Sequence, residues 1–199
     1  ELAEAHDAMV FVDDCHGEGV LGERGAGIVD HFGLQGRVDF EIGSFSKALG
    51  VQGGIVAGSE QMRTHALNHS RSWLLSGSQP PGVAAAQKAA VEVLIDEPQH
   101  HARLWENTNR FRSEMANLGF DLGVSTTPII PVMCGEIRIA KDLVAALRAE
   151  GIVAGAIVFP MVARDAARVR NQLCAGLTDE QLDMILAGYE SAGRKIGLI

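Results

Sequence analysis

The chain has 199 residues, 47% of them hydrophobic, which is enough apolar material for a substantial core and is unlike the composition of a disordered protein. A formal net charge of −8 and the absence of a basic stripe argue against a nucleic-acid-binding protein. The three cysteines, Cys15, Cys134 and Cys174, have neither disulfide nor metal-ligand spacing, and no apolar run approaches the ~20 residues of a membrane span. We therefore expect a cytoplasmic protein that binds neither nucleic acid nor membrane.

The first half of the chain is predicted to alternate apolar strands with glycine-rich loops. Residues 1–7 are typical of a helix end, and the apolar run 8–12 predicts a strand covered on both faces, as in a parallel sheet. Seven glycines in residues 17–36 predict a loop with at most a short helix near 28–32, and they do not form a dinucleotide fingerprint. Further elements expected here are strands at 38–42 and 53–58 and a helix at 61–70 capped by Ser59.

The second half is predicted to begin with helices and to continue as a small α/β domain. Alanine-rich residues 82–95 and the amphipathic stretch 98–118 indicate two helices, and we expect the domain boundary between residues 95 and 96. Pro128 and Pro131 put the strand 127–133 at a sheet edge, because proline cannot donate to the ladder. The remaining elements are a helix at 137–149, strands at 152–158 and 167–173, and a final helix capped by Thr178 and running to about 196.

Two polar clusters follow the first two predicted strands. Asp13, Asp14 and His16 end the first strand, and Lys47 lies in a turn of glycine and serine after the second. Ligands of parallel sheets bind beyond the carboxyl ends of the strands. An acid, an imidazole and a lysine amine match what pyridoxal phosphate requires, namely a partner for the ring nitrogen, a contact to the phenolic oxygen and an amine for the aldehyde. A divalent metal site at the two aspartates and His16 is the alternative, but it has no further ligands and leaves Lys47 unexplained.

Five ordered motifs carry a resemblance that spans nearly the whole chain. They read VDDCHGEGVLGERGAGIVDHFGLQGRVD, GSFSKALG, RSWLLSGSQPP, TPIIPVM and ARVRNQL. With them the chain resembles the α-oxoamine synthases, pyridoxal-phosphate enzymes that condense an amino acid with an acyl-CoA. The resemblance implies fold type I of the pyridoxal-phosphate-dependent transferases, an α/β fold. Residues 1–95 would be the C-terminal part of the large, mostly parallel sheet domain, and residues 96–199 the small C-terminal domain, with the N-terminal half of the enzyme absent.

The resemblance also implies roles for individual residues. Lys47 would hold the cofactor as a Schiff base and later remove a proton from the substrate, and Asp13 and His16 would contact the cofactor ring. Ser44 and Ser76 would reach the cofactor phosphate. A sixth residue, Arg170, would clamp the substrate carboxylate with a bidentate pair. A homodimer with a shared active site is expected from the same resemblance.

Within the family, the reaction we expect is that of glycine C-acetyltransferase, which joins glycine and acetyl-CoA into 2-amino-3-oxobutyrate and CoA in threonine catabolism. The alternatives are 8-amino-7-oxononanoate synthase, which takes alanine and a pimeloyl thioester, and a non-catalytic fragment of such an enzyme. Leu177 departs from the family pattern, because relatives commonly have histidine at this position. This difference bears on the substrate pocket and leaves the Schiff-base apparatus unaffected.

Overall fold

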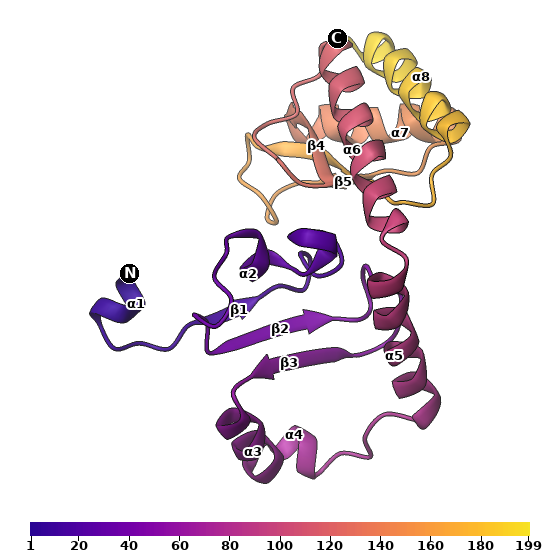
Figure 1. The fold of residues 1–199 in the computed structure, drawn as a ribbon. Coiled ribbons are helices and arrows are strands. Elements are labelled where there is room, and N and C mark those ends of the chain that lie inside the picture. The colour runs from indigo at the N-terminus through magenta and orange to yellow at the C-terminus, as the bar shows by residue number, and fades with distance from the viewer. The chain divides into compact units, whose positions relative to one another are not determined.

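The chain divides into two compact units, each with its own sheet. The structure, a computed structural model, describes residues 1–199, and the units are Glu1–His101 and Ala102–Ile199 (Figure 1). The boundary predicted between residues 95 and 96 falls 101 − 95 = 6 residues before this division. Each unit is described by itself below.

A three-stranded sheet in the order β1-β2-β3 organises the first unit (Figure 1). β1 (Phe11–Asp13) runs parallel to β2 (Phe40–Ser44), and β3 (Gly54–Gly58) runs antiparallel to β2, so this part of the sheet is mixed. β1 begins three residues later than predicted because the ladder begins only at Phe11. The amide of Ala8 instead donates to Ala3 at the end of the first helix.

The helices of the first unit follow the predicted order. Ser59 caps α3, since its hydroxyl accepts a hydrogen bond from the amide of Met62 at 3.2 Å. The loop between β1 and β2 contains a short helix, as predicted, together with a 3-10 turn. The bounds are α1 Leu2–Ala5, η1 Glu23–Gly25, α2 Ile28–His31, α3 Glu60–His69, α4 Arg71–Leu74 and α5 Pro81–Asp96.

The expectation that the first strand is covered on both faces is wrong for these 199 residues. Phe11 in β1 is 60% exposed, and every residue of β3 is exposed. Val29 and Phe45 are the buried apolar residues of this unit. A continuous apolar run predicts a strand that is covered on both faces. These 199 residues contain no second layer that covers β1 and β3, so Phe11 of β1 remains exposed.

The second unit is an antiparallel three-stranded sheet, in the order β4-β6-β5, covered on one face. Alternate residues such as Val132 and Val169, which lie opposite each other, are fully buried, while Met133 and Arg168 face the less covered side. The proline-containing strand β4 lies at an edge of this sheet, as predicted. The strands are β4 Ile129–Gly135, β5 Gly155–Ile157 and β6 Ala167–Gln172.

Three helices build the core of the second unit. α7 packs against all three strands and against α8, and its bounds agree with the amphipathic segment predicted from the sequence. Thr178 begins α8 with a capping box, exchanging side-chain to backbone hydrogen bonds with Gln181. None of the helices of the chain is both long and apolar enough to cross a membrane. The bounds are α6 Gln99–Asn117, α7 Ile137–Ala149 and α8 Asp179–Ile196.

Candidate active site

Asp13 stands at the carboxyl end of β1 with an exposed side chain. One carboxylate oxygen accepts a hydrogen bond from the amide of Cys15 at 3.1 Å, which fixes the carboxylate over the turn that follows the strand. The hydrogen bonds from Cys15 hold the pKa of the Asp13 carboxyl below its ordinary value, and the charges of Lys47 and His16 add to the effect. Asp13 therefore keeps its negative charge at neutral pH.

Lys47 stands in the turn that follows β2. The turn is closed by hydrogen bonds from the amide of Val51 to the carbonyl of Phe45 at 2.7 Å and from Gly50 to Lys47 at 3.1 Å. Phe45 is 7% exposed and anchors the turn, whereas the Lys47 side chain is exposed. The hydroxyls of Ser44 and Ser46 lie 2.8 Å apart. A fixed backbone thus presents one amine and two hydroxyls.

The parallel register brings the two strand ends together. Asp13 lies opposite Ile42, and the amide of Asp14 donates to the carbonyl of Ile42 at 2.9 Å. The charge of Lys47 acts on the carboxyl of Asp13, and so does the charge of His16. The residues predicted to share a site, Asp13, His16 and Lys47, therefore form one electrostatic cluster.

Asp14 turns away from this cluster and organises the loop behind it. Its side chain is 7% exposed and accepts a hydrogen bond from the amide of Ile28 at 2.8 Å. Burial is the main cause that raises the pKa of the Asp14 carboxyl. No group of three histidine, cysteine, aspartate or glutamate residues in the chain is placed to hold a metal ion.

Gly27 shows how tightly the loop closes on Asp14, and its replacement gives a test. Gly27 has φ +102°, and a Cβ there would lie 2.4 Å from a carboxylate oxygen of Asp14. We expect Gly27→Ala to lower the free energy of unfolding by about 3 kcal/mol, from backbone strain and overpacking together. The measurement is urea denaturation of the complete gene product.

Gly33→Ala is the matched control for that test. Gly33 also has a positive φ, +63°, but no atom lies within 4 Å of the position of its Cβ. Only the left-handed backbone then opposes alanine, at about 1–2 kcal/mol. Equal losses for the two variants would contradict the role given to Asp14.

Glu18 is the residue of this region that the sequence did not single out. Its carboxylate accepts a hydrogen bond from the amide of Ser44 at 3.0 Å, so it joins the loop after β1 to the end of β2. Its partner lies 26 residues away in the sequence, and a glutamate between two glycines is an ordinary loop residue by pattern. No local signal in the sequence could have identified it.

Ser76 and Arg170 are described apart from the cluster, because Ser76 makes its hydrogen bond within its own segment and Arg170 belongs to the other unit. Ser76 lies in the exposed segment between α4 and α5, where its hydroxyl accepts a hydrogen bond from the amide of Ser78 at 3.4 Å. Arg170 belongs to the second unit, where it is exposed on the less covered face of the sheet opposite Pro131. Their assigned roles stay predictions.

Leu177, the residue that departs from the family pattern, is held by its backbone. Its carbonyl accepts hydrogen bonds from Asn107 at 3.2 Å and from Arg103 at 3.4 Å, both in α6. Asn107 is 1% exposed and also donates to the carbonyl of Cys174 at 3.0 Å. The backbone of the segment is therefore set by α6, independently of the Leu177 side chain.

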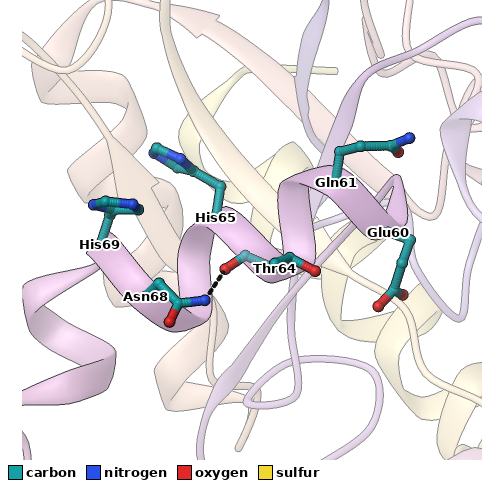
Figure 2. A pocket seen from close by; sticks show the side chains of 6 residues that line it. All are labelled: Glu60, Gln61, Thr64, His65, Asn68 and His69. Carbon is teal, nitrogen blue, oxygen red and sulfur yellow. Dashed lines mark hydrogen bonds between the residues drawn. The ribbon is translucent and has the colours of Figure 1, made fainter.

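A hollow on the surface of α3 is lined by one helix and offers no set of groups comparable to those at the strand ends. Figure 2 shows its two histidines side by side, and Asn68 pointing to the backbone carbonyl of Thr64. The histidine ring centroids are 4.5 Å apart, and Asn68 donates a hydrogen bond to that carbonyl at 2.7 Å. This hollow lacks the acid, amine and hydroxyls found together at the strand ends. Its lining residues are Glu60, Gln61, Thr64, His65, Asn68 and His69.

The groups at the strand ends fit pyridoxal phosphate. Asp13 is held charged, as a partner of a protonated ring nitrogen must be, and Lys47 offers an exposed amine on an anchored turn. The paired hydroxyls of Ser44 and Ser46 are donors of the kind that phosphate oxygens accept. The donor set of these residues therefore agrees with the cofactor that the sequence predicts.

Comparison with known proteins gives the same cofactor class. The family model "Aminotransferase class I and II" matches residues 1–188. The 8-amino-7-oxononanoate synthase of Symbiobacterium thermophilum is 48% identical over all 199 residues, and 8-amino-7-oxononanoate synthase 1 of Bacillus subtilis is 44% identical. The chain covers 51% of each of these proteins and thus spans about half the length of the curated relatives it matches.

Solved structures agree with the fold over the whole chain. The serine palmitoyltransferase of Sphingomonas wittichii superimposes with a TM-score of 0.94 at 32% identity, and the chain covers 50% of it. The serine palmitoyltransferase of S. paucimobilis, solved with a bound PLP–myriocin aldimine, gives 0.92 at 30% identity, again over 50% of that chain. The 8-amino-7-oxononanoate synthase of Francisella tularensis, at 21% identity and a TM-score of 0.81 over 58% of its length, supports the fold alone. The fold is that of fold type I transferases, whose cofactor is pyridoxal phosphate.

Proposed function

Because the chain belongs to the aminotransferase class I and II family, we propose that it is part of a pyridoxal-phosphate-dependent α-oxoamine synthase. The proposed reaction joins alanine to a pimeloyl thioester and gives 8-amino-7-oxononanoate, with release of the free thiol and of the alanine carboxyl as CO2. The observation that carries the choice of reaction is the set of relatives with this name, which are 44–48% identical over the whole chain. These identities favour the 8-amino-7-oxononanoate synthase alternative over the glycine and acetyl-CoA reaction predicted first. The substrates of the complete protein remain part of the proposal, because the chain spans half the length of these relatives.

Pyridoxal phosphate, when bound, supplies an electron sink that stabilises negative charge on the carbon beside the substrate amino group. In the proposal, Asp13 pairs with the ring nitrogen, since its carboxyl keeps its charge. Lys47 holds the cofactor through its aldehyde and then moves the proton of the substrate carbon, and His16 contacts the ring oxygen.

Three further residues complete the proposed binding groups. Ser44 and Ser76 hold the phosphate, and the hydroxyl of Ser44 is supported by its contact with Ser46. Arg170 orients the substrate carboxylate, a task that suits the planar guanidinium. The complete enzyme acts as a homodimer with a shared active site, and sedimentation of the complete gene product tests this assembly.

A substrate comparison tests the reaction. The complete gene product, loaded with pyridoxal phosphate, is assayed with alanine or glycine and with a pimeloyl or an acetyl thioester. We expect kcat/KM for alanine with the pimeloyl thioester to exceed that for glycine with acetyl-CoA by at least about 10-fold, the scale of discrimination that a few methylene groups provide. The reverse preference would support the glycine C-acetyltransferase reading, and no turnover with any pair would support a non-catalytic protein.

A further inference from the structure

Glu18 joins the two strand ends at the point where the lysine turn begins. Its carboxylate accepts a hydrogen bond from the amide of Ser44, the last residue of β2, at 3.0 Å. Ser44 is three residues before Lys47, and the turn that follows it is closed on Phe45. The carboxylate therefore holds the backbone from which the amine is presented.

Gly43 supplies the space that the Glu18 carboxylate occupies. A Cβ at Gly43 would lie 1.7 and 1.8 Å from the two carboxylate oxygens of Glu18. Gly43 is buried, and its backbone is that of an ordinary strand without a positive φ, so the space, and not the conformation, requires glycine here. Glu18 and Gly43 are thus complementary in shape, which argues for a built contact between them.

The charges around Glu18 include the proposed catalytic amine. Burial is the first cause that raises the pKa of the Glu18 carboxyl, while the hydrogen bond from Ser44 and the charge of Lys47 oppose the increase. The charged groups that act on Glu18 are Asp14, Glu41 and Lys47. The charge of Lys47 in turn acts on Asp13, Cys15 and Glu18.

We propose that Glu18 is a positioning residue for Lys47, acting both by holding the Ser44 amide against Gly43 and by placing a negative charge beside the lysine turn. The inference rests on the proposed function, because it takes Lys47 as the residue that holds the cofactor. Its two parts separate by chemistry: glutamine keeps an oxygen that accepts the Ser44 hydrogen bond but has no charge, whereas alanine removes both.

Two variants of Glu18 test the two parts in the complete gene product with pyridoxal phosphate. The readouts are the cofactor concentration that gives half of the visible absorption band and the pH midpoint at which that band changes. For Glu18→Gln we expect nearly unchanged cofactor affinity. We also expect the pH midpoint to be about 1 pH unit lower, because removing a nearby negative charge disfavours the protonated form of the bond between Lys47 and the cofactor. For Glu18→Ala we expect the same shift and, in addition, about 10-fold weaker cofactor binding, the effect of losing one buried hydrogen bond.

Glu41→Gln is the matched control. The charge of Glu41 also acts on Glu18, and the substitution is the same chemical change, but the Glu41 side chain makes no hydrogen bond to the lysine turn. We expect this variant to keep the wild-type cofactor affinity and to shift the midpoint by less than half of the Glu18→Gln shift. If Glu18 acted only through its hydrogen bond to Ser44, the pH midpoint of the band would be the same in Glu18→Gln as in the wild-type protein.

Gly43→Ala tests the contact from the other side. The new methyl group must displace the Glu18 carboxylate, so this variant should weaken cofactor binding to the extent seen for Glu18→Ala. In a protein that already carries Glu18→Ala, the space beside Gly43 is free. Gly43→Ala should then weaken cofactor binding by less than half as much as it does in the wild-type protein.

The outcomes distinguish this inference from the proposed function. A wild-type protein without a visible band would overturn the proposed function, whatever Glu18 does. A normal wild-type band with the same midpoint and affinity in both Glu18 variants would overturn the role of Glu18 and leave the function intact. Additive effects of Gly43→Ala and Glu18→Ala would contradict the shared contact.

Discussion

Replacing Lys47 by alanine should abolish the visible absorption band of the complete, cofactor-loaded protein and lower its kcat by at least about 10²–10⁴-fold, the range attributed to a single proton-transferring group. In the proposed function, the substitution removes both the amine that holds the cofactor and the group that moves the substrate proton. It should not unfold the protein, because the turn is held by Phe45, which is 7% exposed, and by the hydrogen bond from Val51 at 2.7 Å. The measurements are an absorption spectrum and a single-turnover assay.

Lys88→Ala is the control for the Lys47 variant. Lys88 lies on α5 and is exposed, with Glu92 as its ion-pair partner at 2.6 Å. A surface pair of this kind contributes about 0–1 kcal/mol to stability, so the band and the rate should both persist. A visible band retained by Lys47→Ala at wild-type intensity would remove Lys47 from the proposed role and, with it, the assignment of the two strand ends as the cofactor site.

The positions of candidate-site residues could be predicted from the sequence where these residues follow the strand ends. Asp13 directly follows the apolar run 8–12, and Lys47 lies in the turn after the run 38–42. Parallel pairing of the two strands places both at one edge of the sheet. The polar side chains that hold these turns could not be predicted from the sequence. Glu18 contacts Ser44 and Gly43 only in the folded protein, where the loop after β1 lies against the end of β2. Neither the residue type of Glu18 nor its spacing in the sequence indicates this contact.

The elements that were predicted best are those with strong local signals. α7 has an apolar stripe that ends at Gly151, and α8 begins with the Thr178 cap, so both could be bounded from a short window of sequence. The two-sided cover of β1 was predicted wrongly, since cover depends on a second layer. β3 is exposed throughout in these 199 residues, and the curated relatives are about twice as long.

Tyr189 is the residue whose loss should affect the second unit most. Its side chain is fully buried, and its ring makes edge contacts with Phe111 and Phe120, with centroids 6.0 and 5.8 Å away. Its hydroxyl donates to Asn171, whose amide group donates in turn to the carbonyl of Ile130 at 3.0 Å. One side chain thus joins α8, α6 and two strands of the sheet.

Two substitutions separate the ring from the hydroxyl. Tyr189→Ala should lower the free energy of unfolding by about 3–5 kcal/mol, the range for deleting a buried aromatic ring. Tyr189→Phe keeps the ring but leaves the Asn171 oxygen without its donor, and should cost about 1–3 kcal/mol. Met184→Ala, on the same helix and 54% exposed, should change stability by less than about 0.5 kcal/mol. Denaturant unfolding of the complete gene product gives the three values.

The same tyrosine should make the protein sensitive to alkaline pH. Burial raises the pKa of the Tyr189 hydroxyl far above its ordinary value near 10, whereas in the unfolded chain the hydroxyl ionises normally. An acidic group with a raised pKa in the folded state contributes stability below its unfolded pKa, and this contribution is lost as the pH rises through and beyond it. Above pH 10, wild-type stability should therefore fall about 1.4 kcal/mol per pH unit more steeply than that of Tyr189→Phe. Parallel slopes for the two proteins would mean that the hydroxyl ionises freely in the folded state, and the hydrogen bond to Asn171 would then contribute little to the core.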